Sequence, residues 1–263
     1  MLPAVVEPRT HLSMGEHCEK MVKEWNIHRT AQDELALQSH QHGVKAYEDG
    51  FNDDLVFEWM GSKRDGILRS DTTLEKLAKL KTAFDLSDKG TLTAGNSSPL
   101  TDGAAAVFMA SEDYAKQNNH VLLARFIDAE AAAVDFVHNE GLLMAPTIAV
   151  STLLKRHNLT LQDFDFYEIH EAFTGQVLCT LKAWESNDYC RHVLKRDKPL
   201  GSIDLNKLNI KGGSVALGHP YAATGARILG ALAKMLYQKG KGRGLISICT
   251  AGGMGVAAIL EAV

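Results

Sequence analysis

Three short motifs place side chains capable of acid–base chemistry beside glycines or at the end of an apolar run. The first, GGSVALGHP at residues 212–220, holds His219 between a glycine and a proline. Such a turn lets another backbone or a ligand approach closely, and a histidine there could act as a general base near neutral pH. A lone histidine at a turn is more often structural, so this motif gains weight only from the others.

The second motif, ICTAGGMG at residues 248–255, carries Cys249 from an apolar run into a glycine-rich turn. Backbone N–H groups in such a turn can form an oxyanion hole. A thiol, with an ordinary pKa of about 8.5, can exchange a proton there. The alternative is a buried structural cysteine, which is the commoner fate of a cysteine in a strand.

The third motif, IHEAF at residues 169–173, puts His170 where a predicted strand passes into a predicted helix. Ligands commonly bind at this end of a strand in α/β proteins. A helix cap with a neighbouring carboxylate is the structural alternative.

The elements that must position these motifs alternate between strand and helix from about residue 121 onward. Apolar runs predict strands at 122–128, 165–169, 215–217, 245–249 and 256–262, and helical spacing predicts helices at 146–157, 171–184 and 222–238. The alternation predicts a layered α/β domain, with residues 185–209 as an excursion between elements.

The first half of the chain is less regular. Residues 13–48 predict two helices, the first capped by Ser13 and the second, at 30–47, by a capping box at 30–33 in which Asp replaces Glu. Residues 49–73 predict a loop with one short strand, and residues 74–84 a short amphipathic segment. Small residues and turn formers at 91–103 lead into the apolar run 104–110, predicted as a buried strand; they indicate a backbone that approaches another segment closely.

Composition excludes several classes of protein. A chain of 263 residues can bury a sizeable core in one or two domains, and its formal net charge of −4 gives no reason to expect nucleic acid as a partner. No apolar run reaches the roughly 18 residues of a membrane span, and residues 1–8 lack the features of a secretory signal. The four cysteines show no metal-type spacing, so we expect no metal and reduced thiols in the cytoplasm, or in the mitochondrial matrix if a transit segment lies upstream.

Together the three motifs describe a family. The chain resembles the thiolases, with GHP at His219, CxxGGMG at Cys249 and the xEAF box at His170. The resemblance runs in order over nearly the whole chain, with further matches at residues 13–15, 32–34 and 93–103. Most thiolases carry asparagine in place of His170. HEAF, with LPAV at residues 2–5, looks closest to the β-subunit 3-ketoacyl-CoA thiolases of fatty-acid oxidation complexes.

The resemblance implies a thiolase-like layered α/β fold. It implies a complete C-terminal domain at residues 119–263, and a loop-domain segment with the remainder of the N-terminal domain at residues 1–118. It also implies an oligomeric acyltransferase that uses coenzyme A as a substrate and needs no bound cofactor. In that reaction a cysteine thiolate takes the acyl group from a 3-ketoacyl-CoA, releases acetyl-CoA and passes the acyl group to free CoA.

The resemblance further implies roles for individual residues. His219 matches the base that removes the proton of the nucleophile, and Cys249 matches the acid that protonates the departing acetyl carbanion. His170 would position a water that, with His219, stabilises the thioester oxyanion, and the backbone amide of Ala251 would serve a second oxyanion hole. The positions that match contacts to the pantetheine arm are Met14, Ala94, Ser98 and Phe173.

The small-residue box that carries the nucleophilic cysteine of thiolases does not occur in this sequence. Cys18 lies on a charged predicted helix face, Cys179 inside a predicted helix and Cys190 in the excursion. We therefore expect a chain that is inactive alone, because a separate partner chain carries the nucleophile or because the sequence is truncated.

Two other functions remain open from the sequence. A ketoacyl-synthase type of condensing enzyme would use two histidines, or histidine and asparagine, so Cys249 counts against it. The second is a non-catalytic thiolase-like protein that binds acyl-CoA or a partner chain.

Overall fold

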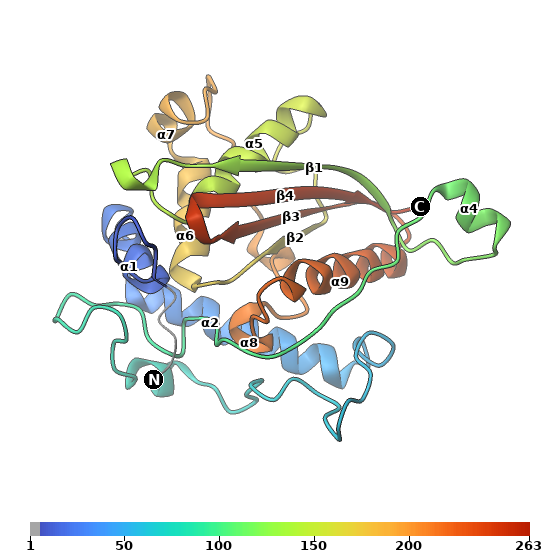
Figure 1. Cartoon of the computed structure of the whole chain (residues 1–263), viewed down its shortest axis with the longest axis horizontal. Helices are drawn as coiled ribbons and strands as arrows, with labels where there is room; N and C mark the ends of the chain where they lie inside the picture. Colours follow the sequence, from blue (N-terminus) through green and yellow to red (C-terminus); the bar gives the residue numbers. More distant parts are fainter. Residues whose placement is uncertain (1–5) are drawn as a thin grey trace.

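A four-stranded sheet lies at the centre of the computed structural model, which describes residues 6–263 (Figure 1). Its order is β1 (Arg125–Ala133), β4 (Met254–Glu261), β3 (Arg243–Thr250) and β2 (Phe166–Ile169). The β1–β4 and β4–β3 pairs are antiparallel, whereas β3 and β2 run parallel. The LPAV match at residues 2–5 lies outside the described residues.

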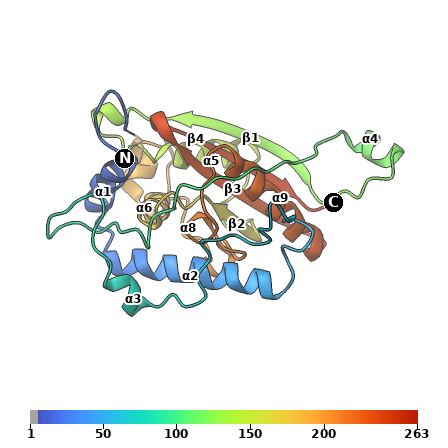
Figure 2. The ribbon, with the colours of Figure 1, turned by 60° about the horizontal axis from the view of Figure 1, so that its bottom comes forward.

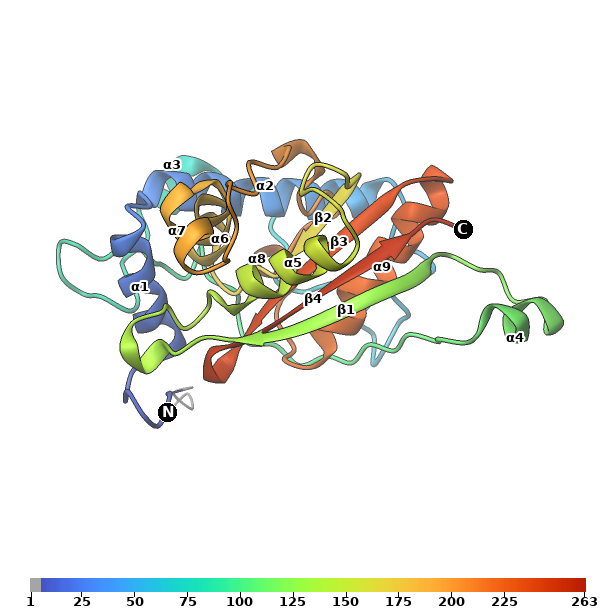
Figure 3. The same cartoon turned by 90° about the horizontal axis from the view of Figure 1, so that it is seen from above.

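Helices cover both faces of this sheet. Helix α5 (Ala145–Arg156), with α6 (Thr174–Glu185) beside it, packs on one face, and α9 (Ala223–Lys239) packs on the other (Figure 3). Alternate residues of a strand point to opposite faces. Accordingly, Leu245 of β3 joins the apolar cluster under α5, and its neighbour Ile246 joins the cluster under α9. This arrangement confirms the predicted layered α/β fold.

The two N-terminal helices pack mainly on other helices: the first contacts α6, and the second contacts α6 and the short helix at residues 214–217. Helix α1 (Met14–Glu24) begins as predicted, because the Ser13 hydroxyl accepts a hydrogen bond from the Glu16 N–H at 3.2 Å and the Glu16 carboxylate accepts one from the Ser13 N–H at 2.7 Å. Helix α2 (Arg29–Glu48) crosses below the sheet (Figure 2).

The capping box predicted at residues 30–33 is wrong. Helix α2 begins at Arg29, so Thr30 lies inside the first turn and cannot cap it. The Asp33 carboxylate instead accepts hydrogen bonds from Arg29 Nε at 3.3 Å and from Asn96 Nδ2 at 2.9 Å. Asp33 therefore connects α2 to a distant loop.

The remaining elements are short. They are α3 (Leu74–Ala78), α4 (Glu112–Gln117), α7 (Asn187–His192), α8 (Ser214–Leu217), η1 (Phe136–His138), η2 (Leu205–Lys207) and η3 (Ala251–Gly253). Helix α8 replaces the strand predicted at 215–217, because the Val215 N–H donates to the buried carboxylate of Glu171 at 3.1 Å and an anion at this end favours a helical turn. The strand predicted within 49–73 is reduced to one isolated bridge between Trp59 and Ser62. Within residues 6–263, no helix has the length and apolar character needed to cross a membrane.

The run 104–110 does not form the buried strand that its composition predicts. It is extended and open to solvent, with Phe108 71% and Met109 59% exposed, and it leads out to α4, which stands away from the body (Figures 1 and 2). A strand needs a neighbour to take its N–H and C=O groups, and no strand among residues 6–263 pairs with this run. The run has the apolar pattern of a strand, but a partner for it is absent from the described chain.

Candidate active site

The loop that carries His170 continues the sheet by one residue. The His170 N–H donates to the Ser247 carbonyl of β3 at 2.9 Å, just beyond the last paired residue of β2. From the other side, the Ser98 N–H donates to the Ala172 carbonyl at 2.9 Å, and Ser97 forms an isolated bridge with Phe173. The HEAF loop is thus fixed between the sheet and a distant segment.

The loop that carries His219 contacts the same segment. After α8 the chain turns at Gly218, whose φ of +94° is a conformation that favours glycine. The His219 N–H then donates to the Pro99 carbonyl at 3.1 Å. Residues 96–100 therefore bond to both histidine loops, which confirms the close approach predicted for 91–103.

The two histidine rings lie against each other. Their centroids are 4.4 Å apart and their planes are tilted by 39°. Nδ1 of His170 is 2.8 Å from Ser214 Oγ, and Nδ1 of His219 is 2.8 Å from Thr224 Oγ1. No residue among 6–263 hydrogen-bonds to Nε2 of either ring, so both rings are anchored at one nitrogen and open at the other.

Burial and one cation keep both rings neutral. Burial lowers the pKa of His170 well below its ordinary value, and the nearby His219 and Arg227 lower it further. Burial also lowers the pKa of His219, again with a smaller contribution from Arg227. A neutral imidazole is the form that can accept a proton, so His219 is available as a base at neutral pH.

A buried carboxylate fixes the geometry of both loops. Glu171, next to His170, accepts hydrogen bonds from Ser39 Oγ at 2.7 Å, Asn209 Nδ2 at 2.6 Å and the Val215 N–H at 3.1 Å. It therefore joins the HEAF loop to α2 and to the glycine-rich loop before His219. Burial raises the pKa of Glu171, and its hydrogen bonds oppose that shift.

Cys249 lies near the end of β3 in a different environment. It is buried in the apolar cluster between α1, α6 and η1, which also contains Phe173, with Met14 packed at its margin. Burial raises the pKa of the Cys249 thiol to about 12. Within residues 6–263 no hydrogen bond joins Cys249 to either histidine.

The structure separates the sequence-predicted residues into two groups. His170 and His219 form one group, and Cys249, Phe173 and Met14 share the apolar cluster. Ser98 lies beside both histidine loops, because its N–H donates to the Ala172 carbonyl and the carbonyl of the next residue, Pro99, accepts from the His219 N–H. Ala94, in the loop before Asn96, and Ala251, at the β3–β4 turn, are both exposed.

The other three cysteines do not reach the surface. Cys18, Cys179 and Cys190 are all buried. Burial raises the pKa of Cys18 and of Cys179 well above the ordinary range. The three cysteines lie inside helices α1, α6 and α7 and not in a turn beside the histidine pair.

Sequence reasoning missed the polar residues that hold the histidines. Ser214 and Thr224 flank the GHP turn, and a hydroxyl beside a candidate base is a signal that could have found them. Arg227 lies three residues after Thr224 in helix α9. Ser39 lies on α2, far away in sequence, and nothing in the local pattern points to it.

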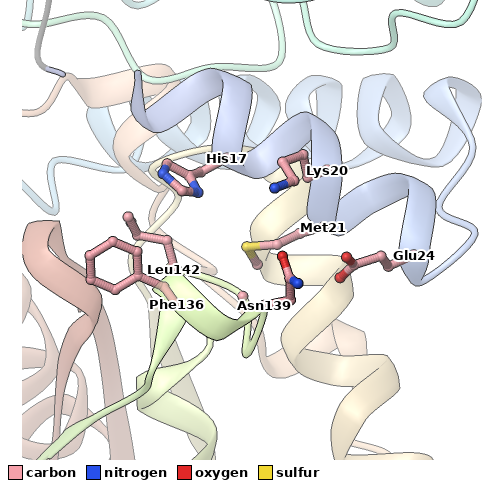
Figure 4. A pocket seen from close by; sticks show the side chains of 8 residues that line it. His17, Lys20, Met21, Glu24, Phe136, Asn139 and Leu142 are labelled. Carbon is pink, nitrogen blue, oxygen red and sulfur yellow. The ribbon is translucent and has the colours of Figure 1, made fainter. Parts of the chain in front are cut away.

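Two cavities elsewhere do not belong to this site. One lies between α1 and η1, is lined by His17, Met21 and Phe136 among others, and has a volume of about 10 Å³, room for a single water (Figure 4). The other, of about 540 Å³, lies between the end of α5 and residues 195–200 and is lined by none of the predicted site residues.

Two known protein families match this chain, one over each part of it. The family described as "Thiolase, C-terminal domain" matches residues 121–262, and "Thiolase, N-terminal domain" matches residues 1–113. This chain belongs to the thiolase family. It carries sequence of both thiolase domains and not of the C-terminal domain alone, so these matches lend no support to a separate partner chain for the N-terminal domain.

Individual thiolases agree with this result. The chain is 41% identical to a 3-ketoacyl-CoA thiolase of Yersinia enterocolitica, over 98% of the chain and 60% of that relative. The acetyl-CoA acetyltransferase of Bacillus anthracis superposes with a TM-score of 0.82 at 36% identity, over 98% of this chain and 62% of that one. Human mitochondrial 3-ketoacyl-CoA thiolase in complex with CoA gives 0.81 at 32% identity, over 98% and 61%. The chain thus spans about 60% of the length of the curated relatives it matches.

Proposed function

We propose that this chain forms part of an acyltransferase that cleaves or makes 3-ketoacyl-CoA, and that residues 1–263 supply its acid and base. The observation that carries the proposal is the histidine pair. Two neutral imidazoles, 4.4 Å apart and each anchored at Nδ1, leave their Nε2 atoms to address one reacting group. Coenzyme A enters as a substrate, and no bound cofactor is required.

In the proposed reaction the three side chains have distinct roles. His219 takes the proton of the attacking thiol, and the thiolate sulfur then bonds to the keto carbon of the substrate. The bond between that carbon and the acetyl unit breaks, and its electron pair stays with acetyl-CoA. Cys249 protonates this carbanion; its raised pKa keeps the thiol protonated until then. The Cys249 thiolate then takes the proton of free CoA, whose sulfur attacks the acyl-thioester and displaces the nucleophile, and that nucleophile recovers its proton from His219. His170 stabilises the thioester oxyanion through a water.

We further propose that the nucleophile comes from the part of the thiolase length that this chain does not span. Its own cysteines are buried, and the pKa values of Cys18, Cys179 and Cys249 are raised, which disfavours the nucleophilic thiolate. Residues 1–263 alone would then not turn over acetoacetyl-CoA. The oxyanion role of the Ala251 amide, the pantetheine contacts of Met14, Ala94, Ser98 and Phe173, and the domain boundary after residue 118 belong to the same proposal.

The test compares the 263-residue chain with the same chain supplied with the part of the thiolase length that it does not span. The remaining length would be supplied from the Yersinia enterocolitica relative, either fused or as a second polypeptide, and thiolysis of acetoacetyl-CoA would be followed. We expect no turnover from residues 1–263 and turnover after completion. Robust turnover by mass-verified residues 1–263 would assign the nucleophile to one of the buried cysteines and overturn this part of the proposal.

The burial of all four thiols also favours a second candidate, a thiolase-like protein that binds acyl-CoA without chemistry. The two candidates separate in the same experiment. A completed protein that binds acetoacetyl-CoA tightly, yet neither forms an acyl-thioester nor releases acetyl-CoA, supports the second candidate.

A further inference from the structure

Behind the histidine pair, two polar residues form a chain that ends on His170. Arg227 Nη2 is 3.2 Å from Ser214 Oγ, and Ser214 Oγ is 2.8 Å from Nδ1 of His170. Ser214 is fully buried. We infer that Ser214 and Arg227 are positioning residues that hold His170 in the tautomer with its proton on Nε2, so that this ring offers a hydrogen-bond donor to the candidate site.

The direction of these two hydrogen bonds follows from which groups can donate and which can accept. A guanidinium has only donors, so the Ser214 oxygen must accept from Arg227. The hydroxyl has one hydrogen, and among residues 6–263 the only acceptor bonded to it is Nδ1 of His170. If Nδ1 carried the proton instead, the buried hydroxyl hydrogen would be left without a partner, which is unfavourable.

The arginine decides the outcome. A serine hydroxyl alone can either donate to an imidazole nitrogen or accept from it, so a Ser214–His170 pair would not fix the tautomer. With Arg227 in place, Nδ1 accepts and a neutral ring must carry its proton on Nε2. The doubly protonated ring is disfavoured by burial and by the same arginine.

One helix turn anchors both rings. Thr224, which bonds to Nδ1 of His219, and Arg227 are three residues apart near the start of α9, and residues at this spacing share a helix face. The result is useful to the proposed reaction, because a donor at Nε2 of His170 can bond to an oxyanion or to the oxygen of the water that serves it. A lone pair there would repel the oxyanion and would take one of the hydrogens of that water. Only this use of the donor rests on the proposed function; the tautomer does not.

The tautomer can be measured on residues 1–263 directly. Long-range ¹H–¹⁵N correlation of histidine side chains distinguishes a protonated ring nitrogen from one with a lone pair, and His170→Asn would assign the signals. We expect the lone pair on Nδ1 and the proton on Nε2. A proton on Nδ1 of His170 in the unmodified chain would overturn the inference, whatever the variants do.

Variants then test the two positioning residues. Ser214→Ala and Arg227→Met should each shift the His170 nitrogens toward a mixture of tautomers, whereas Arg227→Lys, which keeps a donor, should retain the original signature. Thr224→Val is the matched control, because it should alter the His219 signals and leave those of His170 unchanged. A folded Arg227→Met protein with unchanged His170 nitrogen signals would show that Arg227 does not fix the tautomer.

A kinetic readout links the tautomer to the proposed function. In the completed protein, Arg227→Met should lower kcat by up to about 10²-fold with little change in KM, and Arg227→Lys should recover much of the loss. If the completed protein proves inactive, the proposed function fails while the nuclear magnetic resonance result still decides the tautomer.

Discussion

A β-carbon on Gly213 would lie 2.1 Å from the carboxyl carbon of Glu171. The φ of Gly213 is −105°, so the glycine is required by space and not by backbone conformation. Its N–H also donates to Ser39 Oγ, which in turn bonds to the Glu171 carboxylate. The glycine before the histidine turn and the carboxylate beside His170 are therefore fitted to each other.

Replacing Gly213 by alanine should be costly. The added methyl must displace a buried carboxylate that holds three hydrogen bonds, and we expect the free energy of unfolding to fall by about 3 kcal/mol. Urea denaturation measures the change. Gly66→Ala is the control, since a β-carbon there meets nothing within 4 Å. Equal effects of the two substitutions would contradict the fit between Gly213 and Glu171.

Asn96 should tolerate alanine better than aspartate. It is fully buried, and its Nδ2 donates to the Asp33 carboxylate at 2.9 Å. Asn96→Ala removes that donor, at about 2 kcal/mol, whereas Asn96→Asp brings a second buried carboxylate against the first, at about 3–5 kcal/mol. Urea denaturation of both variants and of the parent protein at pH 7 gives the order.

The control for that pair is Asn187→Asp on the exposed first turn of α7, which should change stability by less than about 0.5 kcal/mol. An Asn96→Asp protein as stable as Asn96→Ala would contradict the prediction.

Substitutions of Cys249 and of His219 should slow different steps of the reaction in the completed enzyme. Cys249→Ala removes the proton donor for the carbanion and should slow carbon–carbon cleavage by about 10²–10⁴-fold while leaving acyl loading from a simple thioester nearly intact. His219→Asn removes the base that activates the nucleophile and should slow both steps. Single-turnover acyl transfer, followed apart from overall thiolysis, separates them. Loss of loading in Cys249→Ala as complete as in His219→Asn would reverse the assignment.

Glu168 should make stability fall as the pH rises. Burial raises the pKa of this carboxyl from 4.5 to about 8, with Arg227 opposing the shift and Glu171 adding to it. Between these two values the folded state binds more protons than the unfolded state, so the contribution of Glu168 to stability is fully present below pH 4.5 and falls by about 1.4 kcal/mol per pH unit toward pH 8.

Glu168→Gln removes this titration. The difference in unfolding free energy between variant and parent should therefore move in favour of the variant as the pH rises from 5 to 8, and chemical denaturation at several pH values measures it. Parallel pH profiles of the two proteins would mean that Glu168 titrates normally.

The exposed run 104–110 should make residues 1–263 self-associate. An extended apolar segment with unpaired backbone groups is a ready template for pairing with another chain. Phe108→Asp should shift sedimentation toward the monomer and reduce the binding of an apolar dye. Leu205→Asp, at an exposed leucine of η2, is the control and should change neither. A monomeric parent chain without dye binding would contradict the prediction.

The sequence predicted most of what depends on local pattern. The strands and helices around the sheet follow apolar periodicity, and the Ser13 cap follows from a short-range motif. The failures are tertiary. The segment 215–217 is apolar enough for a strand, yet a carboxylate from another loop turns it into α8, and 104–110 has the pattern of a strand but no neighbour among the described residues.

The site shows the same division. Residue type and motif order pointed to His170, His219 and Cys249. The groups that orient the histidines act across long sequence separations, such as the 44 positions from His170 to Ser214. Spacing alone cannot predict that contact, because it depends on how β2 and α8 meet in the folded chain.

The bonds that residues 96–100 make to both histidine loops have a kinetic meaning. Thr174, Ala172 and His219 all form backbone hydrogen bonds with this one stretch, so the stretch cannot detach without breaking bonds to both loops. The two loops and the stretch between them should open as one cooperative unit, with a common free energy for amide hydrogen exchange. A ligand that stabilises either histidine loop would then slow exchange in the other without touching it.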